Sequence, residues 1–123
     1  MKVLALDFGS ARTGVAVSDP TGTVARPVTI VEQAATDAGF AKLLTVIAEE
    51  APELVVVGMP LTLRGGHGEQ ARETDVFVER LRAAVETRVE TYDERFTSVL
   101  GGGDDARAAA HLLAGYLERQ ARR

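Results

Sequence analysis

The sequence predicts an α/β fold in which one five-stranded mixed sheet carries helices on both of its faces. The first observation is at the start of the chain, where three strand-like segments follow one another with links too short for a crossover, so that neighbouring strands must pair antiparallel. The second is the remainder, where helical and strand-like segments alternate. That order requires parallel strands joined by right-handed crossovers.

Turn residues separate the three antiparallel strands. Residues 3–7 form an apolar run that ends in a carboxylate, and residues 8–14 (FGSARTG) follow as a turn. A second strand resumes at residues 15–18, and the Asp-Pro-Thr-Gly sequence of residues 19–22 is typical of another turn. The β-branched residues of the segment 24–31 predict the third strand.

The alternating part starts with a helix and a buried strand. Apolar residues at positions 40, 43, 44, 47 and 51 follow helical spacing, with Asp37 at the start and Pro52 just after the end. Residues 54–58 (LVVVG) form a continuous β-branched run, as expected of a parallel strand that is buried on both faces.

Two further helices flank one short strand. A helix is predicted over residues 69–88, and a strand over residues 89–92. The apolar face of this helix contains Ala71, Thr74, Phe77, Val78, Leu81 and Val85. A last helix follows a glycine linker at residues 101–103 and opens at Asp104 or Asp105. Its inner face is expected to contain Ala106, Ala109, Ala110, Leu113, Tyr116 and Leu117.

Length and composition limit the classes of protein that fit. The 123 residues suit a single domain over residues 1–123, with 46% apolar and 26% charged residues as in an ordinary globular protein. The lack of cysteine excludes disulfides, a thiolate zinc site and a cysteine nucleophile. No apolar run approaches the ~20 residues that span a bilayer, and the first residues have no signal-peptide pattern. We therefore expect a cytoplasmic protein that does not enter membranes.

The net charge of −4 at first counts against a nucleic-acid partner, since proteins that bind polyanions usually have a basic face. However, 12 of the 14 basic residues are arginine, which binds phosphate through two parallel hydrogen bonds. Arg12, Arg64 and Arg95 follow the first, fourth and fifth strands, so we expect them at one edge of the sheet. They would form a basic rim for phosphate groups, or they are simply solvated loop residues.

Carboxylates are expected at the same edge, where ligands of open α/β sheets bind. Asp7 ends the first strand, and Asp93 and Glu94 end the last one. Asp105, at the start of the final helix, can reach this edge if that helix packs across the sheet. Such oxygen ligands suit Mg²⁺ or Mn²⁺. Two ions ~3.5–4 Å apart would hold the attacking water and the leaving oxygen of a phosphodiester.

Each carboxylate also has a purely structural interpretation. Asp7 could be a turn residue, although an ionisable group at the end of an apolar strand is costly unless it is used. Asp105 could cap the final helix. Asp93 and Glu94 alternate between the two faces of a strand, so at most one of them points directly into the site.

Taken together, these segments resemble the YqgF-type family, described both as Holliday-junction resolvases and as pre-16S rRNA nucleases, with an RNase H-like fold. The resemblance spans nearly the whole chain and rests on the order and spacing of several motifs. The matching residues are 4–10 (LALDFGS), 12–19 (RTGVAVSD), 25–27 (ARP), 57–61 (VGMPL), 93–98 (DERFTS) and 105–117.

The resemblance implies a metal-dependent endonuclease whose catalytic residues are Asp7, Glu94 and Asp105, with Asp93 beside Glu94 among the metal ligands. Asp7 would bridge two Mg²⁺ or Mn²⁺ ions, and Arg95 or Arg12 would steady the developing charge. The substrate would be a branched DNA or a folded precursor rRNA. Resolution of a symmetric junction would favour a homodimer.

The chain departs from the family in one segment. Ten residues, 95–104, separate Glu94 from Asp105, and three of them are glycines, whereas family members usually have a longer stretch here, typically a helix plus a basic loop. We expect weaker substrate binding as a result. Two alternatives remain open: a nucleic-acid-binding module without catalysis, and an ATP-binding domain of the actin and sugar-kinase type, which shares a motif like residues 7–10.

Overall fold

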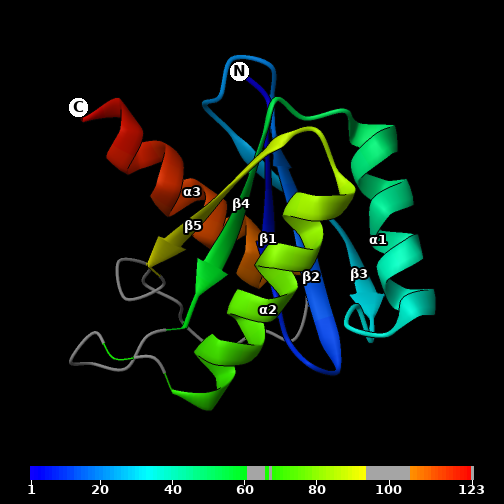
Figure 1. Ribbon diagram of the computed structural model, residues 1–123. Coiled ribbons are helices and arrows are strands. Elements are labelled where there is room, and N and C mark those ends of the chain that lie inside the picture. The colour runs from blue at the N-terminus through cyan, green and yellow to red at the C-terminus, as the bar shows by residue number, and fades with distance from the viewer. Residues whose placement is uncertain (61–65, 67, 94–105, 123) are drawn as a thin grey trace.

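The computed structural model describes residues 1–60, 66, 68–93 and 106–122 (Figure 1). Its sheet has the strand order β3-β2-β1-β4-β5. The strands are β1 (Val3–Asp7), β2 (Arg12–Ser18), β3 (Ala25–Glu32), β4 (Leu54–Met59) and β5 (Arg88–Asp93), and the helices are α1 (Asp37–Glu50), α2 (Glu69–Ala84) and α3 (Ala106–Ala121). β1 pairs antiparallel with β2 and parallel with β4, and this confirms the predicted five-stranded mixed sheet.

Several predicted boundaries differ from the structure. The helix predicted to reach residue 88 ends at Ala84, because Val85 is extended and Arg88 already pairs with Leu54 as the first residue of β5. β2 begins at Arg12, within the segment predicted as a turn, because Arg12 and Thr13 pair with the end of β3. The third strand is shifted by one residue to 25–32.

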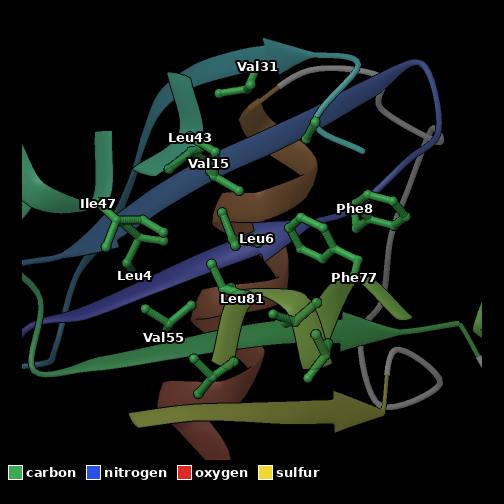
Figure 2. Packing of buried hydrophobic residues seen from close by; sticks show 14 of the residues in the cluster. Leu4, Leu6, Phe8, Val15, Val31, Leu43, Ile47, Val55, Phe77 and Leu81 are labelled. Carbon is green, nitrogen blue, oxygen red and sulfur yellow. The ribbon is translucent and has the colours of Figure 1, made fainter. Parts of the chain in front are cut away.

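Helices cover both faces of the sheet, and each face has its own hydrophobic core. In Figure 1, α1 and α2 lie in front of the sheet, and α3 crosses behind it. Leu4 and Leu6 of β1 pack toward α1 and α2, whereas Val3 and Ala5 pack toward α3. The core on the α1 and α2 side, shown in Figure 2, also includes Val15, Leu43, Ile47, Val55, Phe77 and Leu81. The α3 side includes Ala16, Val56, Tyr92, Ala109, Leu113 and Tyr116.

The buried face of α3 differs in part from the predicted one. Ala109, Leu113 and Tyr116 are buried as expected, and Ala108 and Leu112 are buried in addition. The predicted Ala106, Ala110 and Leu117 are only half-buried. The helix is thus rotated relative to the predicted stripe. None of the helices that the structure describes is long and apolar enough to cross a bilayer.

The loop between β1 and β2 is fixed from both sides. Phe8 is buried, and its ring stacks on Phe77 of α2 with centroids 4.3 Å apart (Figure 2). Gln33 donates a backbone hydrogen bond of 2.9 Å to the carbonyl oxygen of Ala11. A Cβ on Gly9 would lie 2.6 Å from the carbonyl oxygen of Arg12, so the turn requires glycine at that position. These contacts hold the loop that directly follows Asp7.

Candidate active site

The carboxyl ends of β1, β4 and β5 meet at one edge of the sheet, because these strands run parallel (Figure 1). The amino end of β2 and the start of α2 lie at the same edge. Asp7 and Asp93 are the last residues of β1 and β5. The structure therefore places Asp7 and Asp93, at the ends of the first and the last strand, at one edge of the sheet. Open α/β sheets bind their ligands at this edge.

Asp7 is half-buried on the α3 side of the sheet. Val3 and Ala5 pack toward α3, and Asp7 continues this alternation along β1. Its antiparallel partner is Gly14. In the parallel ladder with β4, Leu6 pairs with Val57, so the next level places Gly58 beside Asp7. Both strands next to Asp7 thus carry a glycine at its level, so neither of them places a side chain directly beside the carboxylate. A glycine within a strand often marks such a close approach.

Asp93 and Asp7 take opposite faces of the sheet. Tyr92, one residue earlier, packs on the α3 side, where its ring meets that of Tyr116 edge to face at 5.4 Å. Val89 packs on the α1 and α2 side, and alternation along β5 gives Asp93 the same side as Val89. The register of the sheet therefore separates Asp93 from Asp7 by face, although both lie at one edge.

The Tyr92 phenol lies next to Asp93 in the chain and is buried against α3. Burial among β5 and α3 raises the pKa of Tyr92 above its usual value, with Asp93 and Glu118 adding in the same direction and Arg119 opposing them. The phenol therefore remains neutral at physiological pH. It cannot act as a base for the activation of water there.

Arg12 lies at the carboxylate edge, as predicted. It opens β2 opposite Glu32 and is exposed to solvent. Its side chain forms no hydrogen bond or ion pair within the part of the chain that the structure describes. The guanidinium is therefore available to a phosphate group. Arg12 lies two residues before Gly14, which pairs with Asp7.

The other predicted site residues lie outside the described residues. They are Arg64, Glu94, Arg95 and Asp105. Within residues 1–60, 66, 68–93 and 106–122, no three carboxylate, histidine or cysteine side chains gather into a group that could hold a metal ion. Asp7 and Asp93 are accordingly the two predicted ligands whose positions in the sheet can be described.

Sequence reasoning missed two features of this edge. The position of Gly14 and Gly58 on either side of Asp7 follows from strand register, which a single sequence does not reveal. Lys42 of α1 lines a pocket together with Arg12, although an exposed lysine on a helix carries no signal of its own.

Comparisons with known proteins agree with the motifs. The model of the family described as "RuvX: Holliday junction resolvase" matches residues 1–119. A protein of Chloroflexus aggregans named "Putative pre-16S rRNA nuclease" is 42% identical over 97 residues, which cover 79% of this chain and 68% of that protein. A relative of the same name from Sulfurihydrogenibium sp. is 37% identical over 133 residues, covering 96% and 90% of the two chains.

Solved structures show the same fold. RuvC of Thermus thermophilus in complex with a Holliday junction substrate matches with a TM-score of 0.60 and 19% identity, over 99% of this chain and 96% of that one. A second structure of this RuvC matches with a TM-score of 0.53. At this identity the likeness shows the fold alone, and it confirms the RNase H-like architecture of the resolvases. With the family model matched over residues 1–119 and curated relatives above 30% identity, this chain belongs to the RuvX family, the YqgF-type family of its sequence motifs.

Proposed function

We propose that this protein is a metal-dependent endonuclease that hydrolyses phosphodiester bonds in structured nucleic acid. The observation that carries the proposal is the placement of Asp7, half-buried at the carboxyl end of a central strand between two glycine positions. A carboxylate at such a strand end can offer oxygen ligands to a divalent metal ion. We expect the substrate to be precursor 16S rRNA, cut at its 5′ end, or a Holliday junction; the names of the relatives mention precursor 16S rRNA and the Holliday junction.

The carboxylate of Asp7 suits Mg²⁺ or Mn²⁺, which prefer such oxygen ligands. Asp7 offers such oxygens at a level where both neighbouring strands have glycine. We assign Glu94 and Asp105 as the other two ligands, by their match to the family motif. The face of Asp93 favours Glu94 over Asp93 as the direct ligand, because alternation gives Asp93 the side opposite to Asp7.

The bound ions, two in this proposal, would activate the attacking water and neutralise charge on the leaving oxygen. The chain's own residues position the substrate and stabilise charge. Asp7 fixes the site on a strand that is paired on both sides, so that its backbone is held rigidly. Arg12 offers donors to a nearby phosphate oxygen, and Arg64 and Arg95 complete the basic rim.

The proposal is tested by incubating the protein with a labelled four-way DNA junction and with a precursor 16S rRNA fragment, in Mn²⁺ and then in Mg²⁺. The wild type should cut one of them in a metal-dependent way, and Asp7→Asn should abolish cutting. The control is Glu79→Gln, which also removes one carboxylate but lies exposed on the second half of α2, ion-paired with Arg82. It should cut like the wild type.

The same assay distinguishes the alternatives. Binding without metal-dependent cleavage in the folded wild type would refute the nuclease and favour a binding module of ribosome assembly or recombination. Cleavage of the precursor rRNA alone would place the protein in rRNA maturation in the cytoplasm. Paired cuts in the junction would instead favour a homodimer, which sedimentation of the complex would reveal.

A further inference from the structure

Most basic side chains of the described part of the chain are already neutralised. Ion pairs with carboxylates engage Lys2, Arg26, Arg80, Arg82, Arg88 and Arg122. Within the described residues, three basic side chains form no ion pair or hydrogen bond: Arg12, Lys42 and Arg72. In a protein with a net charge of −4, these free cations are the groups most available to a polyanion.

Two of the three free cations line the same pocket. Arg12 of β2 and Lys42 of α1 border an open hollow of about 480 Å³ between β3 and α1. Thr29 and Glu32 of β3 supply further polar groups to its wall. Figure 1 shows β3 as the outer strand of the sheet, with α1 beside it. The hollow therefore lies beside the outer strand of the sheet.

Arg12 connects the hollow with the level of Asp7 along β2. Arg12 pairs with Glu32, and two residues further along β2, Gly14 pairs with Asp7. Lys42 lies on α1, which covers the face of the sheet opposite to the one that Asp7 takes. A phosphate backbone that passes Asp7 and crosses the edge of the sheet at Arg12 toward β3 would meet Arg12 first and Lys42 next.

Arg72, the third free cation, would hold the sugar–phosphate backbone if the backbone left the site along α2 instead. It is exposed near the start of α2, which also lies at the carboxyl edge, but it stands alone there among the free cations of the described residues. The pairing of Arg12 with Lys42 in one hollow favours the route past β3, because two adjacent cations release more counterions than one.

We propose that the sugar–phosphate backbone of the substrate leaves the cleavage site past β3, and that Lys42 together with Arg12 holds it there. Lys42 is thus a positioning residue that contacts phosphate and not the reacting atoms. Glu32, on the wall of the same hollow, repels the backbone and weakens this grip. The inference rests on the proposed function for the identity of the substrate, but binding can be measured without cleavage.

The test measures the affinity for a fluorescent four-way junction, and for a precursor rRNA fragment, by polarisation in EDTA over a range of salt concentrations. Lys42→Gln should weaken binding several-fold at low salt and reduce the slope of log affinity against log salt by about 0.9, as expected when one phosphate is no longer bound. The double variant with Arg12→Gln should lose about twice that slope. Glu32→Gln should bind more tightly than the wild type, an increase that a damaged fold cannot produce.

The matched control is Arg88→Gln, which removes one charge from an arginine paired with Glu90 at the opposite end of the sheet. It should bind like the wild type. If Lys42→Gln also binds like the wild type, or if Arg72→Gln carries the loss of slope instead, the proposed route is wrong. If Lys42→Gln reduces the salt slope but the wild type shows no metal-dependent cleavage, the proposed route of the backbone stands and the proposed nuclease activity is refuted. If the wild type cleaves but Lys42→Gln binds unchanged, the nuclease activity stands and the route is refuted.

Discussion

Asp7, the last residue of β1, lies opposite Gly14 of β2 in the antiparallel ladder, so no side chain of that strand stands directly beside its carboxylate. On the other side, the ladder with β4 pairs Leu6 with Val57, and its continuation brings Gly58 beside Asp7. A strand interior normally disfavours glycine, which loses more conformational entropy on folding than alanine does. Two glycines around one carboxylate therefore indicate that space at this position matters more than local stability.

The space that these glycines leave beside Asp7 underlies the first prediction. Gly14→Ala places a methyl group beside the carboxylate and should lower the rate of cleavage by about ten- to a hundredfold, since small displacements of reacting groups cost that much. The melting temperature should not fall by more than a few degrees, because alanine is favoured over glycine in a strand by up to about 1 kcal/mol. Rate and melting temperature are measured on the same preparation. An unchanged rate would show that the space is not used.

Metal binding through Asp7 gives a prediction that does not depend on activity. A ligand that binds only the folded protein stabilises it by about 2.7 kcal/mol at a concentration of 100 Kd. Mn²⁺ should therefore raise the melting temperature of the wild type by several degrees, and this rise should disappear in Asp7→Asn. Differential scanning fluorimetry with and without Mn²⁺ measures both. Glu79→Gln serves again as the control and should keep the full rise. An equal rise in all three proteins would exclude Asp7 as a ligand.

The stacking of Phe8, the residue after Asp7, on Phe77 predicts that a change in the core also lowers the rate of cleavage. Phe77 is buried, stacks on Phe8 at 4.3 Å and meets Phe40 edge to face at 6.2 Å. Phe77→Ala should lower the free energy of unfolding by about 3–5 kcal/mol, as large-to-small changes in cores do. Because Phe8 directly follows Asp7, cleavage should also fall below what the lost stability explains at temperatures where the variant is folded.

The neighbouring Val76 is a matched control for this change, since 71% of its surface is exposed. Val76→Ala should alter the unfolding free energy by less than about 0.5 kcal/mol. Urea denaturation of both variants measures the difference. Similar losses in the two proteins would contradict the packing around Phe77.

Much of the fold was predictable, because it depends on local patterns. The order of strands and helices follows from hydrophobic periodicity, which reports the burial of each face directly. The end of α2 was mispredicted because Val85 continues the helical stripe, whereas the parallel ladder with β4 draws Arg88 into a strand. Strand pairing in the folded sheet decides whether such a segment is helix or strand, and the local sequence does not show it.

The candidate site was predictable only as a set of residue types at strand ends. The face that Asp93 takes follows only from the packing of Tyr92 toward α3, which a single sequence does not reveal. The partnership of Arg12 with Lys42 joins residues far apart in the sequence through the packing of α1 beside β3. Such relationships arise from the assembled sheet.

The turn between β2 and β3 predicts a pH dependence of stability. Asp19 accepts hydrogen bonds from the hydroxyl of Thr21 and from the backbone N–H groups of Thr23 and Val24, and these hold its pKa well below the usual value. A carboxyl whose pKa is lowered by folding stabilises the protein above its unfolded pKa of about 3.9, and this contribution disappears as the pH falls toward the folded value. Asp19→Asn should therefore be less stable than the wild type at pH 7.

The difference between the two proteins should shrink as the pH falls below about 4, because the unfolded wild-type chain then takes up a proton at Asp19 and the folded protein does not. Urea unfolding at pH 7, 5 and 3 measures it. A difference that stays constant over this range would show that the carboxylate charge contributes nothing to the turn.

The short segment between Glu94 and Asp105 gives the last prediction. The alignment with the Sulfurihydrogenibium relative runs over 133 positions, more than the 123 residues of this chain, so that relative contains residues without a counterpart here. Replacing residues 95–104 by the corresponding longer segment of that relative should tighten binding to the preferred substrate, and basic residues within it should steepen the salt dependence by about 0.9 for each additional phosphate that they bind. A replacement of equal length without basic residues separates charge from length. If both replacements leave affinity and salt slope unchanged, the length and charge of this segment do not limit substrate binding.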